Sequence, residues 1–150
     1  MKITKKGEYA LRALLDLAYF YNQKTLNLRA ISEHNKIPYK FLEQIMMTLK
    51  HANFVESVKG KMGGYSLKKS PDEITVGEVI RAVEGPLSPV ANAHEIKKRV
   101  ESEIHSGLYF TFLEVRNAIS DVLDKKTLAD VCEKSSELNS SKFAIPMYYI

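Results

Sequence analysis

The sequence predicts a mainly α-helical fold with one small β-hairpin, and three observations support that prediction. Within residues 5–52, apolar side chains recur every three or four positions, which is the spacing of amphipathic helices. The segment 54–67 has two short apolar stretches on either side of a glycine-rich turn, which is typical of paired strands. From Leu108 onward the helical spacing returns. The expected fold is therefore a winged helix-turn-helix with a long dimerisation helix.

Three helices are expected before the hairpin. The first begins after Thr4, a residue that can cap it, and carries an apolar stripe as far as Tyr21. The second is a short helix for which Asn27 is the expected cap. The third runs from Pro38 to about Ala52, because proline suits a first helical turn, where its missing N–H costs nothing. The tight connection between the second and third helices forms a helix-turn-helix unit.

The hairpin is expected to carry a cationic, glycine-rich tip. Lys59 and Lys61 flank Gly60, and Gly63 and Gly64 follow. Glycine permits backbone conformations with positive φ, and it removes side chains that would keep the tip away from a phosphate backbone. A hairpin of this kind directly after a helix-turn-helix is a wing, and the combination is more specific than either part alone.

Positive charge is concentrated in the front half of the chain. Residues 1–69 contain 13 Lys and Arg against 5 Asp and Glu, whereas residues 70–150 contain 9 against 13, and the whole chain carries a net charge of +4. This asymmetry is typical of a protein that presents one face to a polyanion such as double-stranded DNA. The alternative is a short lysine-rich chain that is basic without such a partner.

A second helical region follows the hairpin. Thr75 and Glu78 form an expected capping box for a short helix that Gly85 and Pro86 close. Residues 94–105 are charged and can form a helix. Apolar residues then step by four, three, four and three, which is the spacing of a seam between paired helices. We expect this seam to form a homodimer, and the alternative is that its helix packs on its own domain. The seam consists of Leu108, Phe112, Val115, Ile119 and Val122.

These patterns divide the chain into four parts. We expect a winged DNA-binding domain at residues 1–85, a loop or insert at 86–107, a dimerisation helix with a short helix at 108–134, and a polar linker with an apolar tail at 135–150. Ordinary tails are polar and frayed, whereas most residues after 142 are apolar. The tail is therefore expected to dock on its own dimer or to bind another molecule.

The composition disfavours several classes of protein. No apolar run approaches the ~18 residues of a membrane span, and the first residues lack the features of a signal peptide, so the expected compartment is the cytoplasm. A single cysteine, Cys132, excludes an internal disulfide and a multi-cysteine metal site. No activated nucleophile or ligand spacing points to an enzyme. Cys132 is expected to pack in a short helix, with a redox role as the alternative.

Three segments resemble the Rrf family of bacterial winged helix-turn-helix regulators. They are ITKKGEYALRALLDLA, IPYKFLEQIMMTLKHANFVESVKGKMGGYSL and ITVGEVIRAVEGPL. The resemblance covers residues 1–90 closely and 108–131 more loosely, and it implies a DNA-binding dimer with a long dimerisation helix. Members of the family include regulators of iron–sulfur cluster assembly, of the nitric-oxide response and of cysteine metabolism.

The resemblance also bears on cofactors and partners. Many members hold an iron–sulfur cluster with three cysteines in a loop that corresponds to residues 85–107, and this loop contains none here, so we expect no cluster and no metal. The segments EGPLSPV, VRNAISDVLDKKTLADV and PMYYI are similar to the branch that represses cysteine metabolism together with cysteine synthase. That branch implies that Tyr148, Tyr149 and Ile150 bind cysteine synthase, with the isoleucine inserted into the partner.

The working hypothesis places the third helix in the major groove, with the two units of a dimer on a pseudo-palindromic site. The candidates for base contacts are Tyr39, Lys40, Glu43 and Gln44. The alternatives are that Glu43 is a solvated surface charge or pairs with Lys40, and that Tyr39 belongs to the core. The residues expected at the DNA backbone are Lys5, Lys6, Lys59, Gly60, Lys61, Gly63, Gly64 and Tyr65.

The predicted function is therefore sequence-specific repression by a homodimer that binds double-stranded DNA. Two alternatives stay open. One is a redox- or metal-sensing regulator of the same family. The other is an interaction module whose main role is to bind cysteine synthase through its tail.

Overall fold

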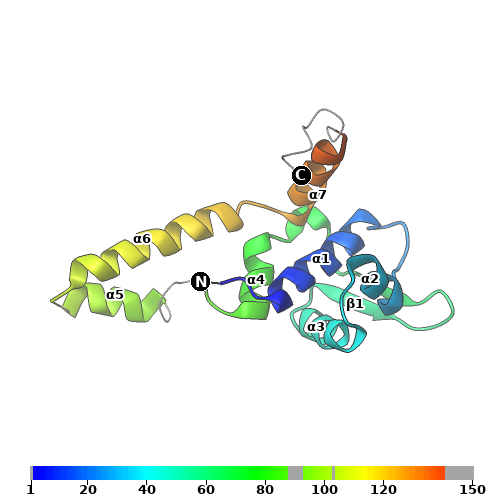
Figure 1. Cartoon of the computed structure of the whole chain (residues 1–150), viewed down its shortest axis with the longest axis horizontal. Coiled ribbons are helices and arrows are strands. Elements are labelled where there is room, and N and C mark those ends of the chain that lie inside the picture. The colour runs from blue at the N-terminus through cyan, green and yellow to red at the C-terminus, as the bar shows by residue number, and fades with distance from the viewer. Residues whose placement is uncertain (1, 88–92, 103, 141–150) are drawn as a thin grey trace.

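The fold is mainly helical with a two-stranded antiparallel hairpin, as the sequence predicts. A computed structural model describes residues 2–87, 93–102 and 104–140. Figure 1 shows a body that contains the hairpin, and a helical arm that projects from it. The elements are α1 (Lys5–Tyr19), α2 (Leu28–Asn35), α3 (Tyr39–His51), β1 (Val55–Val58), β2 (Gly64–Leu67), the 3-10 turn η1 (Pro71–Glu73), α4 (Val76–Glu84), α5 (Ala93–Ser102), α6 (Ser106–Leu123) and α7 (Leu128–Ser140).

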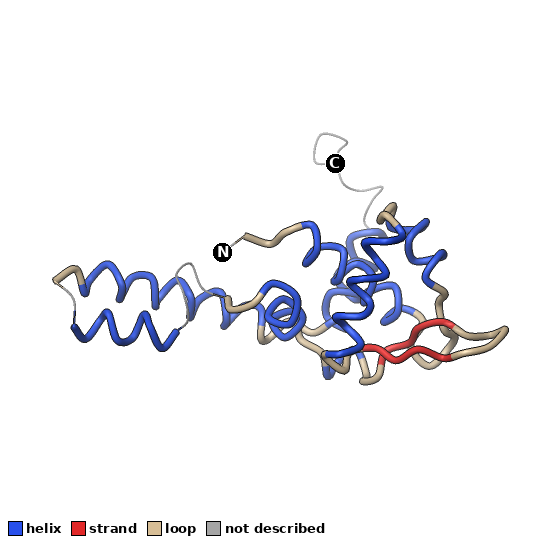
Figure 2. The backbone as a smooth tube through the Cα atoms, turned by 90° about the horizontal axis from the view of Figure 1, so that it is seen from below, coloured by secondary structure: helices blue, strands red, loops and turns tan. Residues whose placement is uncertain are grey.

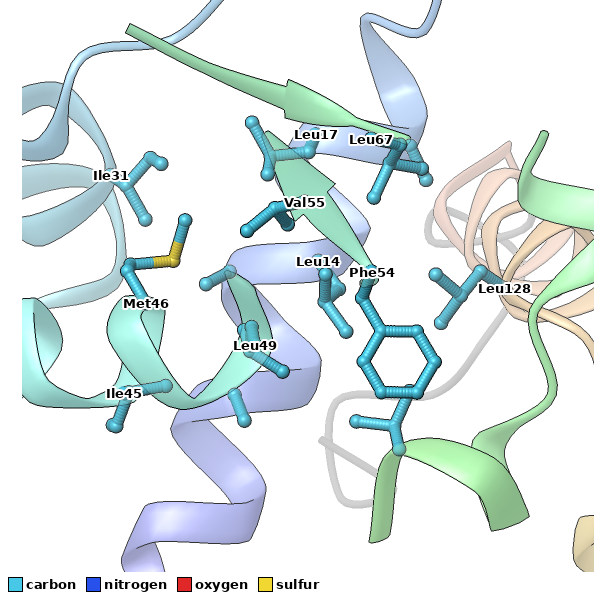
Figure 3. Close-up of a cluster of buried hydrophobic side chains, with 14 of the residues drawn as sticks. Leu14, Leu17, Ile31, Ile45, Met46, Leu49, Phe54, Val55, Leu67 and Leu128 are labelled. Atoms are coloured by element: carbon cyan, nitrogen blue, oxygen red, sulfur yellow. The ribbon is translucent and has the colours of Figure 1, made fainter. Parts of the chain in front are cut away.

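Helix α1 is the centre of the body, because it contacts α2, α3, α4, α7 and β2. Several of its inward residues are small, so neighbouring elements approach its backbone closely. Around it lies one hydrophobic core, in which Leu14 and Leu17 of α1 face Met46 and Leu49 of α3 (Figure 3). The buried residues of α1 are Gly7, Ala10, Ala13, Leu14, Leu17 and Ala18.

The helix starts follow local capping chemistry. The Asn27 side chain accepts a hydrogen bond from the Ala30 N–H at 2.8 Å, which confirms the predicted cap of α2. Pro38 takes the capping position of α3 and not its first helical turn, so the helix begins one residue later than predicted. The Pro38 carbonyl still accepts from the Leu42 N–H at 2.9 Å, and at either position the missing proline N–H would have had no helical partner.

The start of α1 is held by a distant residue. Thr4 occupies the predicted capping position, but its hydroxyl makes no capping bond within its own helix. Instead the Thr4 N–H and hydroxyl donate to Glu84 Oε1 at 2.7 and 2.6 Å, and the Gly7 N–H donates to the same oxygen at 3.1 Å. A carboxylate at the end of α4 therefore caps α1. A side chain at position 7 would overlap that carboxylate.

The hairpin is tied to the segment before α2. Its register pairs Val55 with Leu67 and Val58 with Gly64. Leu26 forms an isolated β-bridge to β2, because its N–H and carbonyl pair with Tyr65 at 3.0 and 2.7 Å. Gly64 has a φ of +153°, and a Cβ there would lie 2.5 Å from the Leu26 carbonyl oxygen, so this position requires glycine. Figure 2 shows the hairpin extending beyond the helices of the body.

The predicted boundary at residue 134 is wrong, because residues 128–140 form one continuous helix that belongs to the body. The Leu128 side chain is fully buried in the core beside Phe54 and Leu67 (Figure 3). The backbone before it pairs with the segment before α4, with Leu128 N–H to Ile74 O at 2.9 Å and Val76 N–H to Lys126 O at 2.8 Å.

The stretch predicted as a polar linker, residues 135–141, is helical through Ser140. Its serines do not interrupt the helix, because the hydroxyls of Ser135 and Ser140 donate to the carbonyls four residues earlier, each at 2.9 Å. Thr127 and Asp130 form a reciprocal cap at the start of α7, and the hydrogen bond from the Thr127 N–H lowers the pKa of the Asp130 carboxyl. The predicted apolar tail lies outside the described residues.

The arm consists of α5 and α6, which lie side by side (Figures 1 and 2). Residues 94–102 of the charged segment thus belong to α5, which covers one side of α6, and the Arg99 guanidinium donates to the Tyr109 hydroxyl at 2.9 Å. At the base of the arm, Arg81 of α4 binds both carboxylate oxygens of Asp124 at 2.7 and 2.8 Å. This hydrogen-bonded pair lowers the pKa of Asp124. A side chain at Gly77 would overlap the same carboxylate.

We expect Leu128→Ala to lower the free energy of unfolding by about 2–5 kcal/mol, because it leaves a cavity in the core beneath the hairpin. The matched control is Leu138→Ala on the same helix, where the side chain is 51% exposed and the change should stay within about 0.5 kcal/mol. Urea unfolding followed by circular dichroism measures both. Equal effects of the two substitutions would contradict the assignment of α7 to the core.

Candidate nucleic-acid interface

The outer face of α3 carries all four predicted base-contact residues. Tyr39 is 42% exposed, Lys40 and Gln44 are also exposed, and Glu43 is partly exposed. The opposite face of the helix is buried in the core through Leu42, Ile45, Met46 and Leu49. The helix therefore has one face fixed by packing and one face open to a ligand.

Two of these side chains have neighbours that bear on the alternatives. Lys40 Nζ lies 3.6 Å from Glu43 Oε2, which is the internal pair considered as the alternative for Glu43. Both groups reach solvent, so this pair is weak and the side chains can exchange it for a ligand. Tyr39 is not a core residue. Its ring lies 5.9 Å from the Arg29 guanidinium of α2, a basic residue that the sequence analysis did not select.

The turn before α3 is firmly held. Lys36 adopts a left-handed conformation with φ of 54°, and it ends α2. Ser32 and Ile37 then exchange two hydrogen bonds across the turn, at 2.6 and 3.0 Å. From α1, the Asp16 carboxylate accepts from Asn35 at 2.6 Å and contacts His34 Nδ1 at 2.8 Å. These contacts fix the angle at which α3 is presented.

The tip of the hairpin is open to solvent. Lys59, Gly60 and Lys61 are exposed, and Met62, which the sequence analysis did not select, is 88% exposed. The Thr25 hydroxyl donates to the Met62 carbonyl at 2.9 Å and holds the tip from the α2 side. The tip therefore presents two cations and one apolar side chain from an anchored backbone.

The inner part of the predicted wing set has a structural role. Gly63 closes the turn through its N–H, which donates to the Gly60 carbonyl at 3.0 Å, and a side chain at position 63 would overlap the Val58 carbonyl. Tyr65 is half-buried against the core and pairs with Leu26. Gly63, Gly64 and Tyr65 thus shape the wing that presents the lysines.

A groove of about 500 Å³ separates the end of α3 from the base of the hairpin. Met47, Lys50 and His51 line it from α3, and Lys68 lines it from the hairpin side. Lys50 Nζ spans toward β1 and donates to the Ser57 hydroxyl at 2.8 Å. This lysine was not among the residues predicted from the sequence, although it continues the exposed face of α3 nearly two turns beyond Gln44. The end of α3 and the base of the hairpin thus form the two walls of one groove.

The first turn of α1 adds lysines near α3. Lys5 is exposed, lies 5.6 Å from the Tyr9 ring, and Tyr9 makes an edge contact with Phe41 of α3 at 5.8 Å between centroids. Lys5 also donates to Glu8 at 3.0 Å, and this hydrogen bond is the main cause of the lowered pKa of Glu8. Lys6 is half-exposed. The carboxylate of Glu8 thus offsets part of the charge at this edge.

The predicted dimerisation seam lies on α6, and its residues differ in their exposure to solvent. Leu108, Val115 and Val122 are 52%, 43% and 61% exposed, whereas Phe112 and Ile119 are half-buried beside them. The exposed side continues through further residues at the same helical spacing. The resulting stripe consists of Ile104, Leu108, Thr111, Val115, Ala118 and Val122.

The residues present do not suit an iron–sulfur cluster of the kind that the family resemblance implies. Such clusters are held by several thiolates. Cys132 lies on α7 against α1, whereas His94 and His105 lie on the arm (Figure 1). Among the residues that the structure describes, no three His, Cys, Asp or Glu side chains gather as a metal-binding group. Nor is any helix of this part of the chain long and apolar enough to cross a membrane.

Comparison with known proteins gives a consistent result. The model of the Rrf2 family, described as iron-dependent transcriptional regulators, matches residues 3–134. The regulator CymR of Bacillus subtilis is 36% identical over 131 residues, which cover 87% of this chain and 89% of the relative. The regulator IscR of Aliivibrio salmonicida is 46% identical over 144 residues, which cover 85% and 86%.

A solved structure of a relative also matches this chain. The structure of CymR from B. subtilis, described as the global cysteine regulator, aligns with a TM-score of 0.74 and 34% identity, and the alignment covers 89% of this chain and 98% of that one. These relatives are transcriptional regulators and not enzymes. The family match spans the body and the arm, including α3 and the hairpin. The chain belongs to the Rrf2 family of DNA-binding transcriptional regulators.

Proposed function

We propose that this protein is a homodimeric repressor that binds a pseudo-palindromic DNA site in the cytoplasm and controls genes of sulfur metabolism. The observation that carries the proposal is that α3 keeps one face open to solvent beside a lysine-tipped hairpin, and that the end of this helix and the base of the hairpin form the walls of one groove. One surface thus offers side chains of a size to enter the major groove and cations for the backbone beside it.

Within this proposal, α3 reads the bases. The Gln44 side chain is exposed and has a donor and an acceptor, which match the major-groove edge of adenine. Glu43 accepts from the amino group of cytosine once it leaves Lys40, and Lys40 is then available for guanine or phosphate. Tyr39, beside Arg29, supplies an apolar contact to a base or a hydroxyl to the backbone.

The hairpin and α1 set affinity and orientation. Lys59 and Lys61 at the exposed tip, and Lys5 and Lys6 at the start of α1, lie on either side of α3 in the sequence and reach solvent. Contacts of lysines with phosphate release counterions but carry no information on base sequence. In this proposal the α3 face sets sequence specificity, and the flanking lysines set affinity.

The double variant Lys59→Ala with Lys61→Ala should weaken binding to specific and to random DNA by the same factor. The slope of log Kd against log salt should fall by about 0.9 for each phosphate that a lysine no longer neutralises. Gel-shift titrations at several salt concentrations measure both quantities. The matched control, Lys97→Ala with Lys98→Ala on α5, should bind like the parent protein. Unchanged affinity of the hairpin variant at moderate salt would refute the role of the wing.

The dimer in this proposal forms through the exposed stripe of α6. Six positions at alternating spacings of four and three, from Ile104 to Val122, face solvent in one chain, and Ile104 is 96% exposed. Helices with such stripes pair along them. Because α5 covers another side of α6, the stripe is an exposed, mainly apolar side that is open to a second chain. A two-fold pair of arms places one α3 on each half of a symmetric site.

Val115→Glu should dissociate the dimer, because it buries an unpaired charge in the middle of the stripe at a cost of about 3–5 kcal/mol. Sedimentation should then show the mass of one chain, and the affinity for a palindromic site should fall while binding to random DNA persists. Asn117→Glu is the matched control, since Asn117 is exposed on another face of α6. A dimer that survives Val115→Glu but not Asn117→Glu would place the interface elsewhere.

The proposed link to sulfur metabolism includes a partner. It is supported by the similarity to a protein described as a global cysteine regulator, and by the likeness of Tyr148–Ile150 to tails that enter cysteine synthase. An apolar side chain at position 150 fills the substrate site of that enzyme in this proposal. The interaction module without DNA binding is the competing function.

Purified cysteine synthase should bind the full chain, and the variant Ile150→Glu should lose this binding by at least tenfold. The substrate amino acid of the enzyme should compete, since it takes the same site. Calorimetry measures binding, and a gel shift with the same preparations should show that Ile150→Glu binds DNA normally. Binding that persists in Ile150→Glu would remove the tail from the interface, and retained enzyme binding by a chain that fails in the gel shift would favour the interaction module.

A further inference from the structure

A second surface of the body is an apolar groove on the side of α7. It has a volume of about 590 Å³ and lies between the end of α1, the start of α2 and the last turns of α7. Leu15, Tyr19, Phe20 and Ile31 supply much of its apolar lining. Tyr19 is 66% exposed, which is a large apolar surface for a residue that borders a hydrophobic core.

The walls of this groove are fixed in place. The Asp16 side chain is only 16% exposed, and it is held by Asn35 and His34 from α2 at 2.6 and 2.8 Å. On the opposite wall, Cys132 Sγ lies 4.0 Å from the Leu15 carbonyl and is half-buried. Burial, with a smaller contribution from Asp16, raises the pKa of the Cys132 thiol. The groove is thus preformed, with a half-buried thiol in its lining.

The segment after α7 has the composition that this groove would bind. Asn139, one residue before the end of α7, lines the groove, so α7 ends at its rim. Residues 143–150 are Phe, Ala, Ile, Pro, Met, Tyr, Tyr and Ile, and Lys142 is the one charged side chain between residues 141 and 150. An apolar segment on a short tether has an effective concentration in the millimolar range near such a site.

We propose that residues 143–150 dock in the groove between α1, α2 and α7 of their own chain. The docked segment covers the exposed aromatic surface around Tyr19 and Phe20 and shields Cys132. Because α2 lines the groove and packs against α3, the docked segment also stabilises the position of the helix-turn-helix. Any partner that captures the segment must first displace it. The proposal does not depend on what that partner is.

Cys132 is the single cysteine of the chain, so its reaction rate reports on the groove without the introduction of another cysteine. Its thiolate attacks an aromatic disulfide reagent, forms a mixed disulfide and releases one coloured thiolate, so the rate is read by absorbance. In a chain that stops after Lys142, this rate should rise at least tenfold over the full chain. A free peptide of residues 143–150 should restore slow reaction, and a peptide of the same residues in scrambled order should not.

A groove variant separates docking from any effect of truncation on folding. Ala30 is exposed and lines the groove, so Ala30→Glu in the full chain should release the segment and give the fast rate of the shortened chain. The same substitution in the shortened chain should leave the rate unchanged. Gln23→Glu, an exposed position outside the groove, is the matched control and should react slowly.

Three results would overturn the proposal. Equal rates for the full and shortened chains would show that the segment does not cover Cys132. Failure of the free peptide to protect the shortened chain would show that the groove does not bind this sequence. Protection in the full chain that disappears on dilution would assign the groove to a second copy of the protein.

Discussion

The structure depends on the burial of one helix, α1, on most of its circumference. Gly7, Ala10, Ala13 and Ala18 keep its surface narrow, so that α3, α4, α7 and the hairpin reach it at the same time. Dense packing of this kind leaves little room for independent movement of the parts. A larger side chain at the buried alanines would push against the neighbouring elements, and one at Gly7 would displace the Glu84 carboxylate. The positions of α3 and of the hairpin are therefore consequences of what α1 can accommodate.

This constraint bears directly on DNA recognition. The face of α3 and the tip of the hairpin are presented by fixed contacts, such as the Ser32–Ile37 exchange and the Thr25 bond to the Met62 carbonyl. Ordering of loops at an interface costs binding free energy, and a preformed surface avoids most of that cost. The lysines and the Lys40–Glu43 pair stay adaptable, because their exposed side chains can exchange this pair for the proposed DNA contacts without movement of the backbone.

The sequence predicted the parts of the fold that depend on local chemistry. Asn27 and the Thr75–Glu78 box cap their helices as expected, since both signals operate within one turn. The return of Leu128 to the core was not predictable, because its neighbours Phe54 and Leu67 are more than 60 residues away in sequence. The polar residues 135–140 suggested a linker, because the contacts that hold their helix against α1 are also distant in sequence. Of the candidate interface, the exposed α3 residues followed from periodicity, whereas Lys50 and Met62 emerged only with the groove and the tip.

In the proposed dimer, the base of the arm connects the body to the spacing of the two half-sites. In a two-fold dimer formed through α6, the distance between the two α3 helices depends on the angle between α6 and the body. Arg81 and Asp124 fix that angle through two hydrogen bonds, and the absence of a side chain at Gly77 lets the two helices meet there. Arg81 also lies on α4, whose last residue, Glu84, caps α1. One short helix thus holds both the arm and the first turn that carries Lys5 and Lys6, so in the proposed dimer a change at α4 would alter half-site spacing and the proposed backbone contacts together.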